Sequence, residues 1–260
     1  MNVLVFDIET IPDTDTGRKL LCLPADMSDH DVTLAMLQLR RQDSGNDFLQ
    51  HYLQRIVAIS AVLRQVDGYH NKLKVWSLGE TNSSEGELIQ RFFDGIDRYS
   101  PVLVSWNGGG FDLPVLHYRA LLHGIHAPRY WEMGEEDQAF RFNNYLSRYH
   151  YRHMDVMDIL AGYQARAAAP LNGIANMLGL PGKMGKSGAS VWQQYYAGEI
   201  DGIRDYCETD VLNTYLIYLR FQLLRGKLTH DGYSNECTVL RDYLTQENKP
   251  HLNEFLAAWT

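Results

Sequence analysis

The sequence has few cysteines, no long hydrophobic run and no excess of positive charge. Its three cysteines, Cys22, Cys207 and Cys237, lie far apart without a Cys-x-x-Cys pair, which argues against a disulfide framework or a zinc site. No segment has the length of a membrane span, and the apolar start of the chain contains acids and lacks the charged region of a signal peptide. We therefore expect a cytoplasmic protein. The net charge of -8 gives no general attraction for nucleic acid, so such binding would require a local basic patch or bridging cations.

The order of strand-like and helix-like segments predicts an α/β fold. Strands are expected at residues 3–6, 56–63, 73–78 and 102–106, and helices at residues 84–99, 112–123, 171–178 and 201–226. A helix between the third and fourth strands is typical of a crossover to a parallel neighbour. Residues 12–54 form a polar stretch with one amphipathic helix near 32–39, residues 129–151 have no clear periodicity, and residues 236–260 look like a short helical tail.

The first motif that indicates chemistry is the pair Asp7 and Glu9, directly after the apolar run of residues 3–6. Successive side chains on a strand alternate between its faces, so these two carboxylates share one face. Neighbouring carboxylates at the end of a core strand are costly unless something compensates them, and divalent cations with oxygen ligands do so. The pair taken alone favours two acids that simply face solvent, and it predicts half of a metal site when the motifs farther along the chain are considered with it.

The second motif, residues 105–114, has the sequence Ser-Trp-Asn-Gly-Gly-Gly-Phe-Asp-Leu-Pro and lies where a strand is followed by a helix. Ligands of open α/β sheets bind at this carboxyl edge. The glycines allow close backbone approach, and Asn107 offers both a donor and an acceptor. Pro114 fits a first helical turn and places Asp112 at the helix entrance, as a site carboxylate or as a cap.

The third motif is the pair Tyr206 and Asp210 on the helix expected at residues 201–226. Residues four apart share a helix face, and both flank the apolar stripe that is expected to pack on the sheet. The alternative is a core tyrosine beside a solvated aspartate.

In this order the three motifs resemble the DEDD exonucleases of the ribonuclease H-like superfamily. The tyrosine four residues before the last aspartate matches the DEDDy branch, because the DEDDh branch would need a histidine where this chain has Asp205. The motifs look most like the 3′–5′ proofreading domain of family B DNA polymerases and the stand-alone predicted exonucleases related to it. The resemblance implies a ribonuclease H-like mixed sheet flanked by helices over residues 1–225, with residues 12–54 as an insertion and residues 226–260 as a helical extension packed on the same domain. We expect no polymerase domain in the remaining residues.

The resemblance also implies a set of catalytic residues and two divalent cations, Mg²⁺ or Mn²⁺. Asp7, Glu9 and Asp210 would bind one cation, and Asp7 would bind the second together with Asp112 through water. Tyr206 would orient the attacking water, because a tyrosine with an ordinary pKa is a poor base. The expected activity is 3′–5′ hydrolysis of single-stranded nucleic acid, with DNA favoured, to nucleoside 5′-monophosphates.

The resemblance also implies which residues would contact the substrate. The resemblance implies that Thr10 and Ile11 lie beside the terminal nucleotide, that Asn107 touches the backbone and that Phe111 packs against a base, although Phe111 also reads as ordinary core. In the glycine-rich stretch at residues 179–188, Lys183 and Lys186 are candidates to neutralise phosphates or are simply solvated.

Three alternatives remain open from the sequence. Ribonuclease D-type enzymes share the catalytic set, so the activity could be that of an exoribonuclease. The fold could also serve as a non-catalytic nucleic-acid-binding module, although all five catalytic positions are filled. Asp155 is the reserve candidate for the fourth carboxylate if Asp112 proves structural.

Overall fold

The computed structural model describes residues 2–69, 71–185 and 188–259, and its centre is a five-stranded mixed sheet in the order β3-β2-β1-β4-β5. β1 pairs antiparallel with β2 and parallel with β4, while β3 and β5 form the edges. This α/β arrangement agrees with the predicted ribonuclease H-like fold. The strands are β1 (Asn2–Pro12), β2 (Gln54–Val66), β3 (Asn71–Ser77), β4 (Val102–Ser105) and β5 (His153–Asp155).

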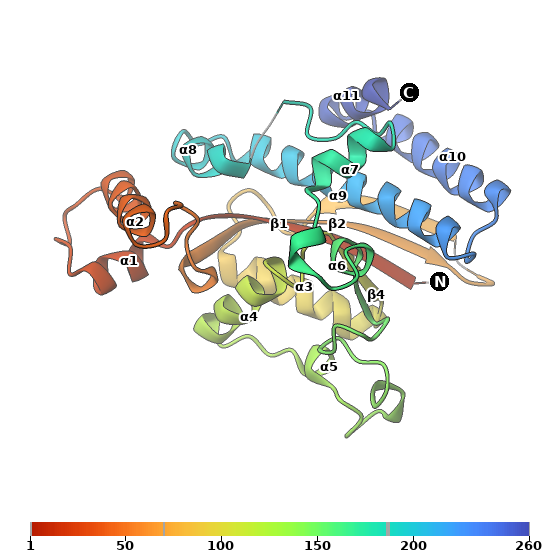
Figure 1. Cartoon of the computed structure of the whole chain (residues 1–260), viewed down its shortest axis with the longest axis horizontal. Coiled ribbons are helices and arrows are strands. Elements are labelled where there is room, and N and C mark those ends of the chain that lie inside the picture. The colour runs from red at the N-terminus through yellow and green to blue at the C-terminus, as the bar shows by residue number, and fades with distance from the viewer. Residues whose placement is uncertain (1, 70, 186–187, 260) are drawn as a thin grey trace.

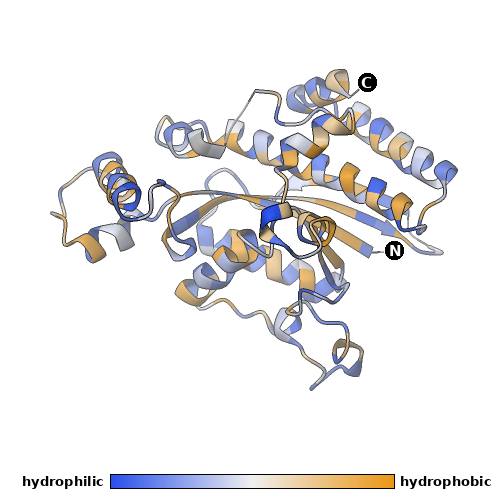
Figure 2. Cartoon of the chain, in the orientation of Figure 1, coloured by the Kyte–Doolittle hydropathy of each residue, from blue (hydrophilic) through white to orange (hydrophobic). Residues whose placement is uncertain are grey.

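Helices cover both faces of the sheet (Figure 1). One face carries α3 and α4, and the other carries α9 with α7, α8, α10 and α11 beyond it. The helices are α1 (Thr14–Leu21), α2 (Asp29–Ser44), α3 (Glu85–Tyr99), α4 (Asp112–His123), α5 (Pro128–Trp131), α6 (Val156–Leu160), α7 (Leu171–Met177), α8 (Val191–Tyr196), α9 (Ile200–Leu224), α10 (His230–Glu247) and α11 (Pro250–Ala258), with short 3₁₀ turns η1 (His51–Leu53), η2 (Gln138–Phe140), η3 (Ala165–Ala167) and η4 (Gly188–Ser190). Figure 2 shows hydrophobic residues on the strands and on the helices that lie against them.

The alternation of side chains along β1 divides the core into two layers. Val3 and Val5 pack with residues of α9, whereas Leu4, Phe6 and Ile8 pack with residues of α3 and α4. Because the period is two, the side chains of the odd-numbered positions that follow Val5 lie on the α9 side. The strand that begins as buried core therefore directs its acidic end toward α9.

The predicted strands and helices are present with shifted ends, and the structure adds elements that were not predicted: β5, α1, α5, α6 and α8. Ser84 caps α3, the helix expected at residues 84–99, by accepting a hydrogen bond from the backbone N–H of Glu87. The short helical tail expected at residues 236–260 forms two helices, α10 and α11, and the first of them begins at His230. β5 was not predicted, because a strand of three residues is too short to show a period.

Residues 12–54, which the sequence analysis expects to be an insertion and which are called the insertion below, carry α1 and α2 and lie at the carboxyl end of β1 (Figure 1). A buried ionic network holds Asp13, the residue after β1: the Arg119 guanidinium donates to Asp13 Oδ2 at 2.5 Å and to both carboxylate oxygens of Glu85. Glu85 Oε1 also accepts the backbone N–H of Ile56 at 2.7 Å. These contacts fix β1, β2, α3 and α4 around the edge where the acids lie.

The C-terminal helices are joined to the sheet by a buried ion pair. Arg64 of β2 is 2% exposed and donates from Nε and a terminal nitrogen to the two carboxylate oxygens of Glu236 on α10, at 2.7 and 2.8 Å. Tyr215 of α9 donates to the same carboxylate at 3.1 Å. Residues of α10 and α11 also share the apolar core with α9 and β1.

We predict that Glu236→Ala lowers the free energy of unfolding by about 3–5 kcal/mol, because it leaves the Arg64 guanidinium buried and unpaired. Urea denaturation measures this change. The double variant Arg64→Met/Glu236→Leu removes both charges and is expected to recover most of the loss. A loss below about 1 kcal/mol in the single variant would contradict a structural role for the pair.

Candidate active site

Asp7 and Glu9 stand at the acidic end of β1, on the side of the sheet that α9 covers. Both still pair with β2, and the register shifts between Glu9 and Thr10. Such bulges redirect the following side chains and are common beside active sites. One oxygen of each carboxylate and the sulfur of Cys207 lie within 4.8 Å of one another.

Asp112 reaches this pair along the edge of β1 that faces β4, opposite the edge that pairs with β2. β4 pairs with Val3, Leu4 and Val5, so β1 continues beyond it. The Asp112 carboxylate accepts the backbone N–H of Ile8 at 3.2 Å, farther along that strand. It stands at the first position of α4, whose N-cap is Phe111, so the structure places it beside the acids and not in the capping position.

The glycine-rich turn that delivers Asp112 is held by Asp155 at the end of β5. Asp155 accepts backbone N–H groups of Asn107 and Gly109 at 2.9 Å each. Asn107 has a left-handed φ of 64°, a conformation that asparagine tolerates better than most residues, and any side chain at Gly108 would collide with Ser105. Asp155 therefore positions the turn, and the structure favours Asp112 over this reserve candidate as the fourth carboxylate.

Helix α9 supplies Tyr206 and Asp210, which are 2% and 4% exposed. Lys183, in the segment before α8, bridges them: its Nζ donates to the Tyr206 hydroxyl at 2.6 Å and lies 3.3 Å from Asp210 Oδ2. Glu208, between the two, faces elsewhere and accepts hydrogen bonds from Ser77 and His251. Residues two apart on a helix point in different directions, so Asp210 faces Lys183 and Tyr206 whereas Glu208 does not.

The cluster is electrostatically costly. Burial raises the pKa of Asp7 well above its usual range, and the charges of Asp112, Glu9 and Asp210 raise it further. Burial and the charge of Asp210 likewise raise the pKa of Glu9, while Lys183 lowers it. Burial raises the pKa of Asp112 to about 7. Burial also raises the pKa of Asp210 above its usual value.

Oxygen-binding divalent cations fit this arrangement. Oδ1 of Asp210 is buried and has no hydrogen-bond partner among the residues that the structure describes. The pKa values of Asp7 and Glu9 are raised by the negative charges of their acidic neighbours. When all four carboxylates are ionised, the cluster therefore carries negative charge that no nearby positive charge balances. Carboxylates that need positive charge and have an unused oxygen are ligands suited to Mg²⁺ or Mn²⁺.

Cys207, one of the three widely spaced cysteines, is a member of the cluster that the sequence did not mark as a site residue. Its buried thiol lies 3.5 Å from the carbonyl oxygen and 3.7 Å from Oδ2 of Asp7. Burial raises the pKa of Cys207 well above its usual range, so the sulfur is a protonated thiol and not a thiolate ligand. It packs beneath the carboxylates, and no sequence pattern distinguished it from the rest of the stripe.

The expected substrate contacts occupy different environments. Thr10 donates to Gln54 at 3.0 Å and is partly exposed, whereas Ile11 is 2% exposed and packs in a cluster with Tyr206 and Cys207. The side chain of Ile11 therefore packs beneath the acids with Tyr206 and Cys207. Asn107 is exposed at the turn, and Lys183 points at the site. Lys186 lies outside the described residues.

Phe111 is partly buried, at the junction of the core and the insertion. It packs against the core shared by α3 and α4, and its ring lies 5.5 Å from that of Phe48 and 5.7 Å from that of His51. His51 also makes a 2.9 Å hydrogen bond with the carbonyl oxygen of Gly110. The insertion thus contacts the glycine-rich turn directly, which the sequence did not indicate.

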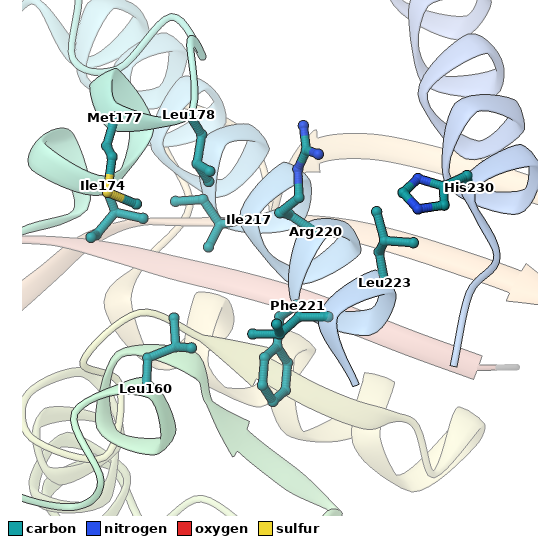
Figure 3. A pocket seen from close by; sticks show the side chains of 10 residues that line it. Leu160, Ile174, Met177, Leu178, Ile217, Arg220, Phe221, Leu223 and His230 are labelled. Carbon is teal, nitrogen blue, oxygen red and sulfur yellow. The ribbon is translucent and has the colours of Figure 1, made fainter. Parts of the chain in front are cut away.

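An apolar cavity of about 460 Å³ lies away from these acids, between α6, α7 and α9 (Figure 3). Its polar side chains are those of Arg220 and His230, and none of the residues that line it is an acid. The cavity offers neither a nucleophile nor a set of metal ligands. None of the described helices combines the length and hydropathy that a membrane-spanning segment requires.

The mixed sheet flanked by helices is that of a ribonuclease H-like α/β protein. The sequence model of the family described as "Predicted 3′–5′ exonuclease related to the exonuclease domain of PolB" matches residues 46–259, and the chain belongs to this family. The chain is also similar to DNA polymerase 1 of Sulfurisphaera ohwakuensis, with 55% identity over 42 residues. That segment is 16% of this chain and 5% of the polymerase, so the chain matches only a small part of that protein.

We predict that Asp112→Asn stabilises the protein in the presence of a chelator, and only at higher pH. In the folded protein Asp112 keeps its proton up to a pH of about 7. In the unfolded chain this carboxyl loses its proton near pH 4. The free energy of unfolding therefore falls as the pH rises from about 4 to about 7. Asparagine cannot ionise and still accepts the Ile8 N–H. At pH 8 we expect a gain on the order of 1–4 kcal/mol in urea denaturation, and no gain at pH 4. An unchanged pH dependence would contradict this electrostatic account.

Proposed function

We propose that the protein is a metal-dependent 3′–5′ exonuclease that hydrolyses single-stranded DNA from the 3′ end to nucleoside 5′-monophosphates. The observation that carries the proposal is the convergence of Asp7, Glu9, Asp112 and Asp210 from β1, α4 and α9 on one buried site. The family description supports 3′–5′ exonuclease activity. The metal, the DNA substrate, the strand preference and the products are our inference.

The four carboxylates would hold divalent cations, which when bound supply Lewis-acid stabilisation of a phosphoryl group and a lowered pKa for water. The protein's own part is to bring the ligands together and to limit the access of bulk water. Asp7 is central in this arrangement, because its pKa responds to the charges of all three other acids. Its removal would therefore affect every part of the site.

Tyr206 would act as a neutral hydrogen-bonding group. Burial, with the negative charges of Asp210 and Glu9, raises its pKa above the usual value, so the phenol stays protonated and cannot serve as the base. Lys183 holds the phenolic oxygen from one side. The pair would fix the position of the attacking water beside Asp210.

We predict that Asp7→Ala abolishes nucleotide release while leaving the fold intact. The assay follows release of mononucleotides from matched single-stranded DNA and RNA oligomers with Mn²⁺, with Mg²⁺ and with chelator. Faster degradation of the RNA oligomer would identify an exoribonuclease. Robust hydrolysis by Asp7→Ala would refute the assignment, and no metal-dependent release by the wild type from any oligomer would indicate a binding module.

We also predict that Lys183→Met lowers kcat about tenfold to a hundredfold with little change in KM, because Tyr206 loses the group that holds it. Tyr206→Phe should have a similar effect. The double variant should be little worse than either single variant, since the two side chains act as one unit. Lys19→Met, an exposed lysine on α1, is the control. A rise in KM with unchanged kcat would show that Lys183 contacts a substrate phosphate instead.

A further inference from the structure

A row of buried polar side chains crosses the sheet at the level of Asp7. Ser60 of β2 stands opposite Asp7, and Ser77 of β3 stands opposite Ser60, so the three side chains share the α9 face. The two serine hydroxyls are 2.9 Å apart. The neighbouring row on this face is apolar and consists of three valines that pack in the α9 core: Val5, Val62 and Val75. The face therefore changes from apolar to polar where the site begins.

Glu208 of α9 continues the row toward the C-terminal helices. Its Oε1 accepts the Ser77 hydroxyl at 2.9 Å, and its Oε2 lies 2.8 Å from Nε2 of His251 on α11 and 3.7 Å from Nζ of Lys249. The other ring nitrogen of His251 lies 3.0 Å from Asp205. Burial raises the pKa of Glu208, but the hydrogen bond with His251 and the charge of Lys249 outweigh it and hold the pKa below its usual value. Glu208 is therefore a buried carboxylate that joins β3, α9 and α11.

The carboxylate fixes the direction of the hydroxyl groups in the row. A carboxylate only accepts hydrogen bonds, so Ser77 donates its one hydroxyl hydrogen to Glu208. Since that hydrogen is used, Ser60 must be the donor in its contact with Ser77. The row thus has one hydrogen-bonding arrangement, and a fully satisfied buried network of this kind specifies one packing of its elements.

The row holds the flank of α9 that faces away from the acids. Arg204, one turn before Glu208, adds to this anchor because it donates to three successive carbonyl oxygens at and just after the end of β3, at 2.8 to 3.3 Å. With 3.6 residues per turn, the flank of Arg204 and Glu208 lies roughly opposite the flank of Tyr206 and Asp210. A rotation of α9 that broke the first pair of contacts would therefore displace the second pair from the site.

Stability alone does not require a polar row in this place. Replacement of buried ionic side chains by well-packed apolar ones is often neutral or stabilising, because burial costs the charges their hydration. The valine row shows that the same interface accepts apolar side chains. Hydrogen bonds add a direction that apolar contacts lack, so the helix cannot rotate or slide without breaking them. The row is better explained by the placement of α9 than by its attachment.

We propose that Ser77, Glu208 and His251 are positioning residues for the nuclease reaction. They act through α9, by fixing the rotation that places Tyr206 and Asp210 in the site. The inference rests on the proposed function and gives the C-terminal helix α11 a task in it.

The test compares activity with stability in a variant whose row is apolar, Ser77→Val/Glu208→Leu/His251→Leu. Mononucleotide release from single-stranded DNA with Mn²⁺ gives kcat and KM, and urea denaturation gives the unfolding midpoint. We expect kcat to fall about tenfold to a hundredfold, with little change in KM and a midpoint no lower than that of the wild type. Glu254→Leu, the same change at an exposed acid of α11, is the matched control and should keep the wild-type kcat.

Two single variants keep the test decisive if the triple variant does not fold. Ser77→Ala removes one oxygen atom and should lower kcat without a change in KM. Glu208→Gln retains an acceptor for Ser77 and a hydrogen-bonding partner for His251, so it should keep a kcat close to that of the wild type.

The outcomes separate this inference from the proposed function. Wild-type kcat in the folded triple variant or in Ser77→Ala overturns the positioning role alone. A loss of kcat that comes with a lower urea midpoint, or a loss in Glu208→Gln as large as in the triple variant, does the same. No metal-dependent release by the wild type overturns the role together with the proposed function.

Discussion

Asp7, Glu9, Asp112 and Asp210 repel one another in a place where burial has removed most of the water that would screen their charges. Such a group cannot arise from local preference, because each ionised carboxylate makes its neighbours harder to ionise. It persists only if the surrounding fold holds the elements together against this repulsion. Among the residues that the structure describes, Lys183 lies beside Asp210, and a single lysine cannot balance four carboxylates.

The rest of the molecule supplies the rigidity that the site requires. β1 is paired on both sides at its start and is packed between two apolar cores, so its acidic end is carried by an element that cannot easily move. The Arg119 network joins the end of β1 to α3 and α4, and the Arg64–Glu236 pair joins β2 to α10. Each is a buried ionic contact whose value lies mainly in the cost of breaking it. Together they prevent the elements around the acids from separating.

The sequence allowed the sheet, the main helices and the acids to be predicted, for reasons that are local. α3 has a clear helical period, whereas β1 and α9 are rich in apolar residues along their length. The geometry of a strand and of a helix then places Asp7 with Glu9, and Tyr206 with Asp210, on shared faces. Asp155 could not be assigned from the sequence, because its work is to accept backbone N–H groups from a turn 46 to 48 residues away. The contact of Lys183 with Tyr206, and the place of Cys207 beneath Asp7, are also products of tertiary packing. Nothing local in residues 12–54 indicated that this segment would contact the glycine-rich turn.

The family match begins at residue 46, so it includes Asp112, Tyr206 and Asp210 but neither Asp7 nor Glu9. The membership of those two acids in the site therefore depends on geometry. β1 is the central strand, its odd-numbered side chains face α9, and the carboxylate of Asp112 bonds the backbone of Ile8 between them. A central strand cannot slip by one residue without turning Val3 and Val5 out of the α9 core and exchanging both faces of the sheet. The apolar half of β1 thus determines where its acidic half points, and the position of the two carboxylates follows from the same alternation that builds the core.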